Sequence, residues 1–136
     1  MSHPPSFEGL KVLVIDDSRT IRKTTETLLR KEGCEVFLAE DGYASLARIV
    51  EVNPQVIFVD IMMPRLDGFQ TCALIKNNRQ YAHIPVIMLS SKEGLFDRAR
   101  GRIVGAIHYL SKPFTRDELL EALGKAKDQL TSAQGN

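Results

Sequence analysis

Residues 55–68 of the chain read Gln-Val-Ile-Phe-Val-Asp-Ile-Met-Met-Pro-Arg-Leu-Asp-Gly. Residues 56–59 are apolar and rich in β-branched side chains, which predicts a strand over 55–59 that is buried on both faces. Asp60 follows directly, and a carboxylate at the end of a buried strand costs free energy unless it is paired or coordinated. Pro64 interrupts regular structure, and Asp67-Gly68 is a turn or helix-start signal. Asp60 is therefore expected at the carboxyl end of a strand, where open α/β sheets bind their ligands.

Similar strand signals lie on both sides of this stretch, separated by amphipathic segments. The further strands are predicted at residues 11–15, 35–39, 85–89 and 106–110. Helices are predicted at about 18–31, from Asp41 to Asn53, from Asp67 to Asn77, at about 93–104, and from Thr115 to 130. Strands that alternate with helices through short connections form a parallel sheet between helix layers. The predicted fold is α/β, a flavodoxin-like (βα)5 doubly wound five-stranded parallel sheet in three layers.

Local signals mark the ends and faces of several helices. Gly33 and Gly105 stand where a helix-ending glycine is expected, and Thr115-x-x-Glu118 is a capping box. In the helix at 93–104, the residues at i, i+4 and i+8 are Leu95, Ala99 and Ile103. We therefore expect these three side chains on one apolar face.

The length of 136 residues suits one domain with its own core. We expect this domain over residues 9–130, with flexible tails at 1–8 and 131–136. The 18 basic and 17 acidic residues nearly cancel, so no nucleic-acid partner is indicated. No apolar run approaches the roughly 20 residues of a membrane span, and no secretion signal is recognisable. The isolated Cys34 and Cys72 are expected to be reduced thiols of a cytoplasmic protein.

Side chains able to hold a cation or a phosphate follow four of the predicted strands. They are Asp16-Asp17, Asp60, Ser90-Ser91 and Lys112. Because parallel strands open their carboxyl ends on one edge, we expect these side chains to meet. Close carboxylates repel one another unless a cation lies among them, and oxygen ligands favour Mg²⁺, with Mn²⁺ as a substitute. With a hydroxyl and an ammonium beside it, Asp60 suits in-line phosphoryl transfer to a carboxylate.

Each of these signals also has an ordinary structural explanation. The aspartates and the Ser90-Ser91 pair are each compatible with a helix cap, and Lys112-Pro113 with a turn. Only their coincidence at four predicted strand ends favours a phosphate site over a set of caps.

Taken together, the motifs resemble the receiver domain of two-component response regulators over about residues 9–130. The resemblance rests on Val-Ile-Asp16-Asp17-Ser, Asp60-Ile-Met-Met-Pro64-x-x-Asp67-Gly68, Val-Ile-Met-Leu-Ser90-Ser91 and Tyr109-Leu-Ser-Lys112-Pro113-Phe114.

The resemblance implies a role for each site residue. Asp60 is the implied phospho-acceptor. The implied direct Mg²⁺ ligands are Asp17, Asp60 and the backbone carbonyl of Met62, while Asp16 acts largely through water. Ser90, where the family commonly has Thr, is the implied switch hydroxyl that swings toward the phosphoryl group. Lys112 is the implied counter-ion of that group, and the Lys112–Pro113 bond is typically cis in the family. Tyr109 is the implied aromatic switch, whose ring turns inward when the hydroxyl moves.

Three further stretches resemble the stand-alone regulators of the chemosensory pathway that drives type IV pilus twitching. These are residues 58–68, 71–78 and 101–105. This implies a chemotaxis-type histidine kinase as the phosphate donor and a protein as the output partner, such as a pilus motor component or its regulator. Since no DNA-binding or enzymatic domain follows, we expect output by protein binding, from a monomer for which dimerisation on activation stays open. For residues 71–78, partner contact and core packing are both open explanations.

Several alternatives stay open at this point. A phosphate sink would drain the kinase without an output partner. A Mg²⁺-dependent phosphohydrolase usually has a cap insertion and a second Asp at the position of Met62, and both are missing. An FMN binder would need a Ser/Thr-rich loop in place of Asp16-Asp17. Three arginines on one predicted helix indicate an acidic partner or a solvated face: Arg98, Arg100 and Arg102.

Overall fold

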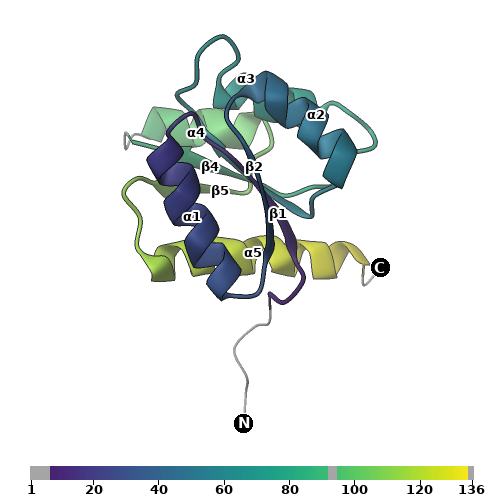
Figure 1. Cartoon of the computed structure of the whole chain (residues 1–136). Coiled ribbons are helices and arrows are strands. Elements are labelled where there is room, and N and C mark those ends of the chain that lie inside the picture. Colours follow the sequence, from purple (N-terminus) through teal and green to yellow (C-terminus); the bar gives the residue numbers. More distant parts are fainter. Residues whose placement is uncertain (1–6, 92–94, 135–136) are drawn as a thin grey trace.

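The computed structural model describes residues 7–91 and 95–134. Its elements are β1 (Lys11–Ile15), α1 (Arg19–Lys31), β2 (Glu35–Ala39), α2 (Gly42–Val52), β3 (Val56–Asp60), α3 (Gly68–Lys76), β4 (Val86–Ser90), α4 (Leu95–Ile103), β5 (His108–Ser111) and α5 (Arg116–Gln134). The five strands are parallel and lie in the order β2-β1-β3-β4-β5 (Figure 1). This order confirms the predicted doubly wound α/β fold. Within the described residues, no helix is long and apolar enough to cross a membrane.

The sheet separates two apolar layers. Along β1, Val12 and Val14 point to one side while Leu13 and Ile15 point to the other, as the period of two in a strand requires. The first side packs against α1 and α5, and the second packs against α2 and α3, with α4 on that same side (Figure 1). The strands are thus covered on both faces, which leaves the carboxyl edge of the sheet as the place where side chains from several loops meet.

Side-chain caps fix where the helices begin. Asp41 accepts a hydrogen bond from the Ala44 N–H at 2.7 Å, and Asp67 forms a capping box with Gln70. Thr115 and Glu118 exchange the two hydrogen bonds of the predicted capping box. The glycines expected after α1 and α4 have φ of +91° (Gly33) and +101° (Gly105), a backbone region that favours glycine. The sequence predicts such helix ends because capping depends on residues only a few positions apart.

Both ends of the domain differ from the expected boundaries. Phe7 is only 6% exposed and packs into the layer beneath α5, where Lys127 Nζ lies 5.6 Å from its ring centroid. The Gly9 N–H donates to the Gly33 carbonyl at 2.9 Å. Phe7 therefore belongs to the folded domain, although the expected tail includes it. At the other end, α5 continues to Gln134, so residues 131–134 are helical where a tail was expected.

Two strand ends and one helix face also differ from expectation. Asp60 and Ser90 are the last residues of β3 and β4, not the first residues beyond them, because Asp60 pairs with Leu89 and Ser90 pairs with Ser111. In α4, the side chain of Ile103 is 84% exposed instead of facing the core. The buried position is Gly101, where an added Cβ would lie 3.5 Å from Met88 Cγ. An added Cβ would therefore make an ordinary van der Waals contact, and the backbone of α4 lies close over β4 at this position.

Arginine side chains cover the outer edge of β2, an edge strand of the sheet. Arg30 of α1 donates to the Val36 carbonyl at 3.0 Å. Arg48 of α2 donates to the Leu38 carbonyl at 3.4 Å, and its guanidinium lies 5.3 Å from the ring centroid of Phe37. Backbone acceptors of β2 that do not pair with β1 thus find partners from both helix layers.

Candidate functional site

The centre of the site is a cluster of three carboxylates at the carboxyl edge of the sheet. Because β1 and β3 are neighbours with Ile15 opposite Val59, Asp16 follows β1 next to the position of Asp60. Asp16, Asp17 and Asp60 each offer an oxygen within 4.8 Å of the others. Asp16 and Asp60 are buried at 0% and 2% exposure, whereas Asp17 is exposed at the rim. The strand ends therefore gather the predicted aspartates around one point.

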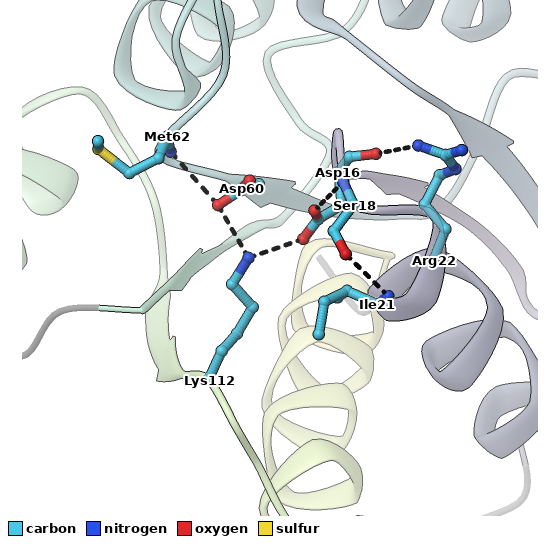
Figure 2. Close-up of polar contacts among 7 residues, drawn as sticks. All are labelled: Asp16, Ser18, Ile21, Arg22, Asp60, Met62 and Lys112. Atoms are coloured by element: carbon cyan, nitrogen blue, oxygen red, sulfur yellow. Dashed lines mark hydrogen bonds and ion pairs between the residues drawn. The ribbon is translucent and has the colours of Figure 1, made fainter.

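Lys112 reaches into this cluster from the end of β5 (Figure 2). Its Nζ lies 3.0 Å from Asp16 Oδ2 and 3.2 Å from Asp60 Oδ1. Its backbone N–H donates to the Ser90 carbonyl at 2.6 Å, which ties the end of β5 to the end of β4. The Lys112–Pro113 bond is cis, as the resemblance implies. One ammonium thus pairs with two buried carboxylates.

Backbone and side-chain donors hold the two buried aspartates in place (Figure 2). The Ser18 N–H donates to Asp16 Oδ1 at 2.8 Å, and the Met62 N–H donates to Asp60 Oδ1 at 3.3 Å. Arg22 Nη1 donates to the Asp16 carbonyl at 2.6 Å. Sequence reasoning missed Arg22, since its partner is a backbone carbonyl and no residue pattern reveals such a contact.

The electrostatics of the cluster leave an excess of negative charge. Burial raises the pKa of Asp60 to about 7, and the charge of Asp16 adds to the rise, while Lys112 opposes it. For Lys112, burial lowers the pKa, but the hydrogen bond to Asp16 and the charge of Asp60 outweigh it, so its pKa is raised. Three carboxylates face one ammonium, and a divalent cation would offset the difference. Oxygen-only ligands of this kind fit Mg²⁺.

Ser90 and Met62 lie beside the carboxylates and line a groove of about 590 Å³ together with Asp17. Ser90 is 1% exposed at the end of β4, whereas the side chain of Met62 is 57% exposed. The groove also has lining residues that sequence reasoning did not assign to the site: Met63, Pro64, Phe69, Asp97 and Arg100. Asp97 and Arg100 come from α4, so only the packing of that helix brings them to the groove.

Tyr109 lies apart from this groove. It pairs with Met88 across the β4–β5 ladder, two residues before Ser111, which pairs with Ser90. Its side chain is 7% exposed, and the guanidinium carbon of Arg98 lies 4.6 Å from the ring centroid. The ring is thus buried, and Tyr109 lies two residues along β5 from Ser111, the partner of Ser90.

A model of the response regulator receiver domain matches residues 12–124. The chain belongs to this family. It is 66% identical to the protein PilG of Pseudomonas aeruginosa over 116 residues, which are 85% of this chain and 86% of PilG. It is also 35% identical over 111 residues to the response regulator MprA of a Mycobacterium species, covering 82% of this chain but only 47% of MprA.

Solved structures of receiver proteins share the fold. The chemotaxis protein CheY4 of Vibrio cholerae superposes with a TM-score of 0.83 at 34% identity, over 87% of this chain and 98% of CheY4. A response regulator receiver domain protein of Clostridium thermocellum gives a TM-score of 0.84 at 31% identity, over 91% of this chain and 98% of that one. The chain is therefore a signalling domain of the two-component, chemotaxis type, and a homologue of PilG.

Proposed function

We propose that this receiver domain accepts a phosphoryl group from a histidine kinase on Asp60 and signals by phosphorylation-dependent protein binding. The observation that carries the proposal is the position of Asp60. It is a buried carboxylate at a strand end, it contacts Lys112 at 3.2 Å, and its oxygens lie within 4.8 Å of those of Asp16 and Asp17. The adjoining groove gives a donor side chain access to this edge of the sheet.

In the proposed transfer, an Asp60 oxygen attacks the phosphorus of a phosphohistidine. A P–O bond forms, the P–N bond breaks, and the imidazole nitrogen leaves with the electron pair of that bond. Asp16, Asp17, Asp60 and the backbone carbonyl of Met62 would hold Mg²⁺, directly or through water, and the bound ion supplies charge neutralisation. Lys112 and the Ser90 hydroxyl pair with phosphoryl oxygens. Attack of water on phosphorus later releases phosphate and restores Asp60, so the only turnover is slow self-dephosphorylation.

Phosphorylation is proposed to pull Ser90 and Tyr109 inward and to remodel the surface of α4, β5 and α5. Neutralisation of charge at the cluster biases a surface with two arrangements. The 66% identity with PilG supports a place in chemosensory control of type IV pilus twitching, in the cytoplasm. The proposed partners are a chemotaxis-type kinase and a pilus motor component or its regulator.

The chemistry can be tested with phosphoramidate, a small donor that contains the same kind of P–N bond as phosphohistidine. Wild type, Asp60→Asn and Asp128→Asn would be incubated with donor and Mg²⁺, and phosphate uptake measured by intact mass and peptide mapping. Asp128 is an exposed carboxylate of α5, so its variant controls for the loss of one charge. We expect uptake on Asp60 in wild type and Asp128→Asn only. Stable uptake by Asp60→Asn would contradict the assignment.

The output can be tested by binding purified candidates for the kinase and the pilus proteins with and without a beryllofluoride phosphoryl mimic. An output switch binds a pilus component only when wild type carries the mimic. If instead only the kinase binds, and the mimic weakens that contact, a phosphate sink is the correct function.

A further inference from the structure

Over residues 97–103, the part of helix α4 whose side chains the structure describes, few large apolar side chains face the sheet. Its buried position is Gly101, Ala99 is half-buried, and Ile103 is 84% exposed. Two arginines instead contact aromatic rings on neighbouring elements. The guanidinium of Arg98 lies 4.6 Å from the ring centroid of Tyr109 on β5, and that of Arg100 lies 4.3 Å from Phe69 on α3. The position of α4 therefore depends in part on these two contacts.

Arg98 and Tyr109 lie between two small hollows. One of about 120 Å³ is lined by both residues together with Met88, Gly101 and other residues under α4. The other, of about 210 Å³, is lined by both residues on the side of Glu118 and Glu121 of α5. A closely packed ring has no room to turn, because protein interiors leave few voids. Here the ring has free volume on two sides, and Arg98 lies over its face.

The guanidinium stays charged at every physiological pH and is attracted to the electron-rich face of an aromatic ring. Arg98 makes this contact with Tyr109 in its buried orientation, at 7% exposure. A contact present in only one of two ring orientations biases the equilibrium toward that orientation. For a partly buried cation–π pair, the bias is about threefold to tenfold.

We propose that Arg98 is a positioning residue for Tyr109, which holds the ring in its buried orientation and couples the ring to α4. The relay part rests on the proposed function, because Tyr109 transmits phosphorylation only if the domain is a phospho-switch. Movement of the ring then moves α4 through Arg98, and a partner that displaces Arg98 releases the ring. Arg98 thus has a role that a charge on a solvated helix face does not have.

The test uses protein labelled with 3-fluorotyrosine and ¹⁹F NMR, with the Tyr109 resonance assigned by Tyr109→Phe. The variants are Arg98→Ala, Arg98→Lys, and Arg79→Ala, which removes the same charge from an exposed position that lines neither hollow. In Arg98→Ala we expect the Tyr109 resonance to move toward a solvent-exposed value and the affinity for beryllofluoride with Mg²⁺ to fall about threefold to tenfold. Arg98→Lys should restore part of the ring position and part of the beryllofluoride affinity, and Arg79→Ala should change neither.

The two proposals fail in different ways. If the Tyr109 resonance and the beryllofluoride affinity of Arg98→Ala equal those of wild type, Arg98 does not position the ring. A fall in melting temperature with an unmoved Tyr109 resonance identifies a merely structural role and also overturns the proposal. If wild type itself does not respond to beryllofluoride, the proposed function fails, while the ring resonance of the resting protein still decides the role of Arg98.

Discussion

Replacing Asp60 by Asn should stabilise the metal-free domain, although it removes the proposed phospho-acceptor. Asn has nearly the shape of Asp and the charge of a protonated carboxyl group. Burial and the charge of Asp16 raise the pKa of Asp60 from its ordinary 3.8 to about 7. A rise of this size corresponds to about 4 kcal/mol of unfavourable free energy for the ionised form in the folded state. We take this as an upper limit and expect a gain of about 2 kcal/mol, since relaxation around the charge reduces the penalty.

The pH dependence fixes the sign of this effect. A carboxyl group whose pKa is raised by folding binds its proton more tightly in the folded state. Its contribution to stability is therefore complete below the unfolded-state pKa of 3.8, and it is lost as the pH rises through the folded-state pKa of about 7. The gain in Asp60→Asn should therefore be near zero at about pH 4 and reach its full value at about pH 8. Measuring the difference between wild type and Asp60→Asn at each pH cancels the titration of the groups that do not interact with Asp60.

The assay is urea unfolding with a chelator present, at a series of pH values, for wild type, Asp60→Asn and Asp128→Asn. The unfolding free energy of Asp128→Asn, a change at an exposed position of α5, should stay within about 0.5 kcal/mol of that of wild type. Adding Mg²⁺ at a hundredfold excess over its dissociation constant should then raise the unfolding free energy of wild type by about 2.7 kcal/mol and that of Asp60→Asn by much less. A stability difference that is constant or negative from about pH 4 to pH 8 would refute the reasoning about buried charge.

The remaining predictions concern two residues at the carboxyl edge of the sheet and one residue of the core. Lys112→Ala should retain Mg²⁺ binding by calorimetry but lose the effect of beryllofluoride on partner binding; a normal response would show that Lys112 does not couple the site to the surface. Gly68→Ala should lower the rate of phosphate uptake about tenfold or more, because the added Cβ would clash with the backbone carbonyl of Asp60; an unchanged rate in single-turnover experiments argues against a rigid loop. Phe7→Ala should cost about 3 kcal/mol of unfolding free energy in urea, whereas loss of a tail residue would cost almost nothing.

The features predicted from the sequence are those that short-range patterns determine. Buried strands reveal themselves as apolar runs, and once the strands alternate with helices, the topology gathers Asp16, Asp60 and Lys112 at one edge. The missed features depend on contacts between distant parts of the chain. Phe7 belongs to the core because α5 covers it, more than a hundred residues later. Arg98 looks like a solvated charge in the sequence, and only the approach of β5 makes it a partner of an aromatic ring.

The α4 face shows the limit of periodicity most clearly. The spacing of Leu95, Ala99 and Ile103 predicts one apolar stripe, yet Ile103 faces solvent and Gly101 faces the sheet. A glycine carries no hydrophobic signal, so a pattern search passes over it. It nonetheless occupies the position of α4 that faces Met88, where an added Cβ would make an ordinary van der Waals contact.

The arginines over the edge of β2 bear on how this protein behaves at high concentration. An edge strand with open carbonyls is a template on which a strand from another molecule can add, and such additions grow into aggregates. Arg30 and Arg48 occupy the Val36 and Leu38 carbonyls and place two positive charges along that edge. An incoming strand would have to displace both side chains before its own N–H groups found acceptors. These two side chains therefore disfavour strand addition on this side of the sheet.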